Sequence, residues 1–142
     1  MDDELTEIIK KAASDADNEK ILNTNNKENT RIKNEMLQEL NLSNADFLSY
    51  SEKLKHFIYV DELPDLRYGC FIRWISLKNP DSLKLTNGSN ICDIKINENG
   101  TLILCKGFSG SFFNLKMDEC LIFRKLTNEE RILLTAIDFI ET

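Results

Sequence analysis

Four cysteines and a single histidine are the side chains of this sequence that most often bind metals. The cysteines are separated by 22, 13 and 15 positions, with no C-x-x-C pair: Cys70, Cys92, Cys105 and Cys120. Structural zinc sites usually take paired ligands from tight turns. The spacing therefore predicts no metal site, and the apolar context of each cysteine predicts a reduced thiol that packs as a small hydrophobe.

Catalytic motifs find little support. The segment GFSG (107–110) has a serine between glycines, but a nucleophile elbow needs G-x-S-x-G between a strand and a helix. His56 lies near the end of an expected helix, and the residues adjacent to it in the sequence include no carboxylate. The acidic pairs at 61–62 and 118–119 fit solvated turns, and no phosphate-binding glycine loop is present. We therefore expect no enzymatic activity and no cofactor.

Basic and aromatic residues recur in the second part of the chain, on segments that an antiparallel sheet can bring to one face. We take them as a candidate binding face: Arg73, Lys95, Lys106, Phe108, Phe112, Lys116 and Arg124. Small β-barrels bind single-stranded nucleic acid through stacked aromatics in a positive channel, and they bind peptides by adding a strand or gripping a side chain. Lysines that alternate outward along a strand also serve solubility alone.

The stretch YGCFIRWISL (68–77) places Arg73 in the middle of an apolar strand pattern. Alternation puts Ile72 and Trp74 on one side and Phe71 and Ile75 on the other, with Arg73 on the second side. Neither side is wholly polar, so we expect a central strand that is covered on both faces. Arg73 then either reaches the rim of the sheet or pairs with a carboxylate such as Asp93.

The charge balance argues against general binding to nucleic acid or to an anionic membrane, because the net charge is -6 and the sequence pI is about 4.9. The charge is uneven along the chain. Residues 1–45 hold six basic and ten acidic side chains, a balance of -4, whereas residues 53–126 hold eleven and eight, a balance of +3. A basic face on the second part is therefore compatible with the acidic total. The acidic N-terminus and the lack of a long apolar run predict a soluble, cytoplasmic protein that does not bind membranes.

Helical periodicity dominates the first 60 residues. A narrow apolar stripe at Leu5, Ile8, Ile9 and Ala12 predicts a short helix, and the Asn-rich residues 17–30 read as a linker. Two amphipathic helices follow from residue 31, the second opening with a capping-box spacing at Ser43.

After Pro64 the apolar period changes from that of a helix to that of a strand, and five or six short antiparallel strands are expected. The pair Asn99-Gly100 lies between two strand-like runs and predicts a two-residue hairpin. On a later strand, Phe113 and Leu115 should face one way and Phe112, Asn114 and Lys116 the other.

A C-terminal helix should begin at Thr127, with Glu130 three residues on, and expose an apolar face that packs on the sheet. The expected fold class is α+β: a small antiparallel β-barrel or meander, SH3-like or OB-like, with N-terminal helices and a C-terminal capping helix. We divide the chain into an acidic helical arm with linker (1–30) and a helical hairpin plus barrel with its terminal helix (31–142).

The chain is rich in Asn, Ile and Lys and poor in Ala, as AT-rich coding produces. With the segments DLRYGCFIRWISLKN and FRKLTNEERILLTAIDFI, residues 60–140 resemble the uncharacterised small proteins of giant nucleocytoplasmic DNA viruses of the mimivirus kind. The resemblance implies a cytoplasmic virion or virus-factory protein that binds another viral protein or the packaged genome.

We therefore expect a non-enzymatic protein-protein interaction or structural module that contacts a protein partner or a second copy of itself as a homo-oligomer. The acidic N-terminal helix is the expected docking arm. The alternative is a nucleic-acid-binding accessory protein that uses the basic aromatic face.

Overall fold

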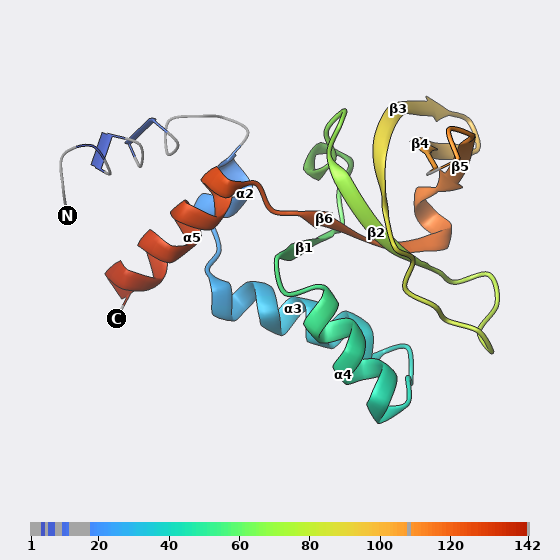
Figure 1. Ribbon diagram of the computed structural model, residues 1–142, viewed down its shortest axis with the longest axis horizontal. Helices are drawn as coiled ribbons and strands as arrows, with labels where there is room; N and C mark the ends of the chain where they lie inside the picture. Colours follow the sequence, from blue (N-terminus) through green and yellow to red (C-terminus); the bar gives the residue numbers. More distant parts are fainter. Residues whose placement is uncertain (1–3, 5, 8–9, 12–17, 108, 142) are drawn as a thin grey trace. The chain divides into compact units, whose positions relative to one another are not determined.

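The computed structural model describes residues 4, 6–7, 10–11, 18–107 and 109–141 as an α+β structure (Figure 1). In chain order the elements are α2 (Glu19–Leu22), α3 (Asn26–Gln38), α4 (Asn44–Lys53), β1 (Phe57–Val60), η2 (Leu63–Asp65), β2 (Phe71–Ser76), β3 (Ser89–Asn97), β4 (Gly100–Lys106), β5 (Phe112–Lys116), η3 (Met117–Glu119), β6 (Cys120–Lys125) and α5 (Asn128–Glu141). The stripe predicted at Leu5, Ile8, Ile9 and Ala12 lies outside the described residues. No helix in the described part of the chain has the length and apolar character to cross a membrane.

The chain divides into two compact units. One comprises Met1–Ile32 with Leu126–Thr142, and the other comprises Lys33–Lys125. In this division the C-terminal helix groups with the segment that ends at Ile32. The predicted boundary at residue 30 stays a prediction. Local periodicity predicts that α5 must bury an apolar face, but it does not say against which segment.

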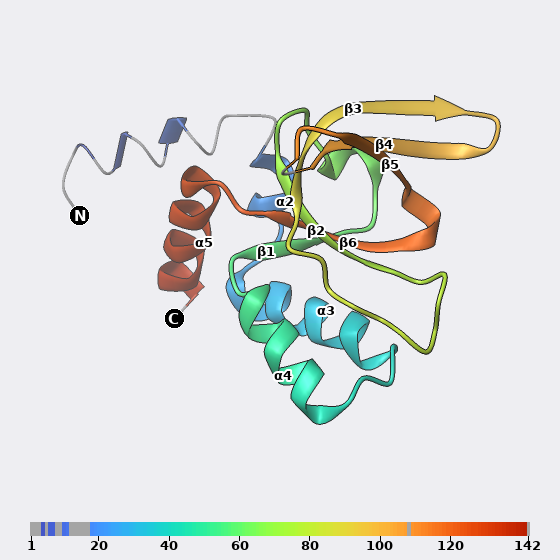
Figure 2. The ribbon, with the colours of Figure 1, turned by 45° about the vertical axis from the view of Figure 1, so that its right-hand side comes forward.

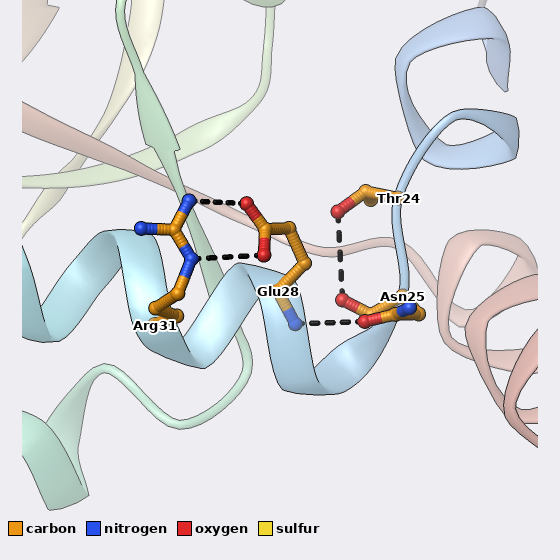
Figure 3. Close-up of polar contacts among 4 residues, drawn as sticks. All are labelled: Thr24, Asn25, Glu28 and Arg31. Carbon is orange, nitrogen blue, oxygen red and sulfur yellow. Dashed lines mark hydrogen bonds and ion pairs between the residues drawn. The ribbon is translucent and has the colours of Figure 1, made fainter.

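The Asn-rich segment, predicted to be a linker, caps a helix. The side-chain oxygen of Asn25 accepts a 2.7 Å hydrogen bond from the backbone N–H of Glu28, in the first turn of α3 (Figure 3). Arg31 forms a two-pronged ion pair with Glu28, whose Oε2 accepts from Arg31 Nε at 2.9 Å, and this hydrogen bond lowers the pKa of Glu28. Asn favours turns and helix caps alike, so composition alone did not distinguish the two.

Side chains of the same segment also bind the end of α5. Asn25 Nδ2 donates to Glu141 Oε2 at 2.7 Å, and Asn26 Nδ2 donates to Asp138 Oδ2 at 2.7 Å. At its other end α5 begins with the predicted capping box: Thr127 N–H donates to Glu130 Oε1 at 2.9 Å, and Glu130 N–H donates to Thr127 Oγ1 at 3.1 Å. Asn25 and Asn26 thus belong to one folded unit with α5.

The sheet of the second unit is open. Its six antiparallel strands follow the order β1-β6-β2-β3-β4-β5, so β2 to β5 form a meander and β6 returns beside β2. The end strands β1 and β5 do not pair with each other, and the barrel alternative of the prediction is therefore not formed. The meander and the α+β class are confirmed.

The inner side of the sheet carries the main core. Residues of all six strands belong to it: Val60, Ile72, Trp74, Ile91, Ile103, Cys105, Leu115 and Ile122, with Phe113 packed against them. A flat sheet cannot bring its first and last strands into one cluster, so the sheet must curl around this side.

The opposite side is covered over half of its width. Helices α3 and α4 lie side by side (Figures 1 and 2) and pack Leu37, Tyr50 and Leu54 on residues of β1, β6 and β2. Phe71 and Ile75 of β2 belong to this second cluster, which confirms the prediction of a strand covered on both faces. No residue of β3, β4 or β5 belongs to it among the described residues.

Two local predictions, the cap of α4 and the hairpin near Gly100, are confirmed, but the turn of the hairpin lies one residue earlier than predicted. Ser43 accepts from Asp46 N–H at 3.1 Å and caps α4 as expected. The predicted hairpin joins β3 to β4, but Asn97 pairs with Gly100, so the turn residues are Glu98 and Asn99. Gly100, at φ 115°, is the first residue of β4, as in hairpins where a glycine bulge follows the turn.

Candidate binding face

Three rows of side chains form the uncovered outer side of β3, β4 and β5. Cross-strand register sets Lys95, Leu102 and Lys116 in one row. Asp93, Leu104 and Asn114 form the next, and Asn90, Lys106 and Phe112 form the third. We call these nine residues the outer face. Four of the seven predicted site residues lie on it: Lys95, Lys106, Phe112 and Lys116.

The outer face combines an exposed aromatic with positive charge. Phe112 is 60% exposed, and all three lysines are exposed, whereas Leu102 and Leu104 are half-buried between them. Asp93 is the acidic member, and its Oδ1 accepts from the N–H of Ile94 at 2.9 Å. Leu102, Leu104 and Phe112 thus form an apolar strip on the outer face, and the three lysines lie around it.

One lysine of the outer face also has an acidic neighbour. Lys116 Nζ lies 3.9 Å from Glu119 Oε1, at the limit of an ion pair. Both side chains are solvent-accessible, so this pair holds Lys116 only weakly. Lys116 therefore stays available to an outside partner.

The two predicted arginines do not belong to the outer face. Arg73 Nε donates to the backbone carbonyl of Thr86 at 2.8 Å, and desolvation lowers its pKa. A carbonyl, and not the carboxylate of Asp93, therefore anchors this side chain. Arg124 is 1% exposed and is buried in the sheet, so it cannot meet a solvent-borne ligand. Phe108 lies outside the described residues.

Three of the four cysteines belong to the inner core or pack against it, and the four differ in exposure. Cys105 is buried, Cys70 and Cys120 are half-buried, Cys92 is exposed, and none is in a disulfide. Burial raises the pKa of Cys105 to about 12 and that of Cys120 to about 11, so both stay neutral thiols near pH 7. Within the described ranges no group of side chains is arranged to hold a metal ion, and the absence of a metal site stays a prediction.

The serine motif lies in a turn between two strands. Gly107 N–H donates to the carbonyl of Ser111, and the hydroxyl oxygens of Ser109 and Ser111 are 2.9 Å apart. The described residues of this motif, Gly107, Ser109 and Gly110, lie between β4 and β5, whereas a nucleophile elbow lies between a strand and a helix. The segment therefore resembles a nucleophile elbow in residue types but not in position between secondary-structure elements.

The sequence analysis did not include Leu102 and Leu104 in the candidate face, and it included Arg73 and Arg124, which do not lie on the outer face. Alternation along β5 did place Asn114 with Phe112, and extending the same register across the hairpin would have added Leu102 and Leu104. Nothing in the local pattern of β6 distinguished Arg124 from an outward basic residue, because burial there depends on packing by distant segments. Comparisons identify no relatives: no protein-family model, curated protein or solved structure matches the chain.

Proposed function

We propose that this chain is a non-enzymatic protein-interaction module that contacts its partner through the outer face and the adjoining edge of β5. The observation that carries the proposal is the exposure of Phe112 on the half of the sheet that α3 and α4 leave uncovered. A strand residue of this size is normally packed in a sheet that has a covering layer.

The composition of the outer face suits a protein partner. Exposed aromatics tend to provide the binding energy of an interface, and surrounding charges mainly steer association. Phe112 with Leu102 and Leu104 supplies the apolar centre, and the three lysines supply a rim that favours an acidic partner. An acidic partner class includes this chain itself, whose net charge is -6.

A nucleic-acid-binding accessory role is the second candidate, favoured by the three lysines beside Phe112. It is weaker than the sequence indicated, because Arg73 and Arg124 are engaged elsewhere and Asp93 lies within the outer face. A place in a virion or virus factory, implied by the resemblance above, stays a prediction.

Light scattering after size-exclusion chromatography separates the two roles, with and without single-stranded DNA or RNA at two salt concentrations. Two variants are compared with the wild type: Phe112→Ala, and a triple change of Lys95, Lys106 and Lys116 to Glu. The control triple changes Lys53, Lys55 and Lys84 to Glu, which are exposed lysines that do not belong to the outer face and give the same net charge.

On our proposal Phe112→Ala weakens association, and single strands do not bind at either salt concentration. Single-strand affinity that falls with salt, by a log-log slope of about 0.7 per phosphate contact, and that only the outer-face triple abolishes, would establish the nucleic-acid role instead.

A further inference from the structure

The outer edge of β5 presents unused backbone groups. Gly107 N–H bonds the carbonyl of Ser111, and bonded pairs alternate along an antiparallel ladder, so Phe113 and Leu115 are the residues that bond β4. The N–H and C=O groups of Phe112, Asn114 and Lys116 therefore point away from β4. The described part of the chain provides no partner for the N–H and C=O of Phe112 and Asn114 or for the N–H of Lys116, because β5 is the last strand of the sheet. The C=O of Lys116 is at the N-cap of η3, where it is the acceptor for the first turn.

This edge has few of the features that usually prevent edge pairing. Natural edge strands are protected by proline, a bulge, an inward charge or a covering segment. The β5 strand contains no proline, its register with β4 is unbroken, and its inward residues are Phe113 and Leu115. Lys116 is its only charged residue. The other edge strand differs, because β1 has four residues and its first N–H, of Phe57, donates to Leu54.

From this pattern we infer that β5 pairs antiparallel with β5 of a second copy of this chain, in a register centred on Asn114. The inference rests on the proposed function and names its partner. In this register Asn114 lies opposite the second copy's Asn114, and Phe112 lies opposite the second copy's Lys116. Three bonded pairs then form across the twofold axis, with about four bonds that do not involve the C=O of Lys116 and two that share this C=O with η3. A shift by two residues leaves one residue of each strand unpaired.

The side chains are complementary in the same register. On the inner side Phe113 lies opposite the second copy's Leu115, so the apolar row of Ile94, Ile103 and Leu115 continues across the dimer. On the outer side each Lys116 lies opposite a Phe112 ring and not opposite the other Lys116, which permits a cation–π contact and avoids like-charge repulsion. Such a twofold, isologous contact closes at a dimer.

The interface is one short strand per copy, so we expect a dimer that dissociates on dilution. Sedimentation equilibrium over about a hundredfold range of concentration measures it. The deciding variant is Asn114→Pro, which removes an N–H that points away from β4, and proline is tolerated at such edge positions. Its matched control is Asn114→Ala, which changes the side chain and keeps the N–H.

We expect the wild type and Asn114→Ala to dimerise alike and Asn114→Pro to associate at least tenfold more weakly. Circular dichroism verifies that the proline variant is folded. A monomeric wild type, or a folded proline variant that dimerises like Asn114→Ala, overturns the inference. If Phe112→Ala dissolves a dimer that Asn114→Pro leaves intact, the proposed function stands and the edge pairing is wrong.

A cross-link tests the register even if the proline variant does not fold. In a Cys92→Ser background, Asn114→Cys places two thiols at the twofold axis, where Cα atoms of a bonded pair are about 5.5 Å apart and a disulfide fits. Oxidised glutathione accepts the two electrons and is released as two glutathione thiols. The control is Cys92→Ser with Ser111→Cys, whose position lies opposite Met117. A covalent dimer from the first variant alone is expected, and equal cross-linking of both overturns the register.

Discussion

The ring of Trp74 on β2 lies 5.5 Å from the ring of Phe113 on β5, although β3 and β4 separate these strands in the sheet. Three strand spacings of about 4.8 Å would hold them about 14 Å apart in a flat sheet. The contact therefore shows that the sheet curls, and it links the edge strand to the central strand across the inner core. It also fixes which side of β5 faces inward, and hence which side presents Phe112.

Neighbouring phenylalanines should therefore differ in their effect on stability. Phe113→Ala removes the contact with Trp74 and leaves a gap in the inner core, so we expect a loss of about 2–3 kcal/mol in the free energy of unfolding, measured in urea. Phe112→Ala removes an exposed ring and should change it by less than about 0.5 kcal/mol. Equal losses would show that β5 does not face as described.

Alanine substitutions at two glycines of positive φ, Gly88 and Gly100, should also differ in their effect on stability. A Cβ at Gly88 would lie 2.5 Å from Phe71 Cζ and 2.7 Å from the carbonyl oxygen of Ile72, whereas a Cβ at Gly100 meets nothing within 4 Å. Gly100→Ala bears only backbone strain, about 1–2 kcal/mol. Gly88→Ala adds a clash with Phe71 and with the backbone of β2, so this variant should be destabilised by at least about 2 kcal/mol more in thermal or urea unfolding. A Gly88 variant as stable as the Gly100 variant contradicts the close approach.

Lys33 predicts a pH dependence of stability. Its Nζ is buried and donates to the carbonyls of Leu54 at 2.7 Å and Lys55 at 3.3 Å, at the end of α4, and desolvation lowers its pKa to about 8 from 10.5. Since the unfolded chain then binds the proton more tightly, this group's contribution to stability rises as pH increases from about 8 to about 10.5, by about 3 kcal/mol at most. The rise should be seen in the wild type relative to Lys33→Met, from urea unfolding at several pH values. Lys55→Met, at an exposed position, is the control, and it should follow the wild type.

The thiols should react in an order set by exposure. Cys92 is exposed, whereas burial raises the pKa of Cys105 to about 12 and disfavours its thiolate, which is the reactive form. Under native conditions we expect one rapid alkylation by iodoacetamide, located at Cys92 by mass spectrometry and absent in Cys92→Ser. All four thiols should react in denaturant. Rapid native labelling of Cys105 would contradict its place in the inner core.

Short-range features of this protein followed from the sequence. Alternation correctly divided the residues of β2 and β5 between the two sides of the sheet, and cap spacings located the starts of α4 and α5 at Ser43 and Thr127. These features depend on residues within a few positions of one another, so a linear pattern contains them. Four residues of the outer face were predicted from the sequence, because side chains alternate between the two sides of a strand: Lys95, Lys106, Phe112 and Lys116.

Only the tertiary structure decided whether the sheet closes, which half of it the helices cover, and which segment packs with α5. These outcomes depend on contacts between distant residues, such as Trp74 with Phe113 and Asn25 with Glu141. Arg124 shows the same limit, since its position on β6 is readable from the chain but its 1% exposure is not. The spacing of apolar residues indicates which side chains must be buried, whereas the segment that buries them is determined by packing across the whole fold.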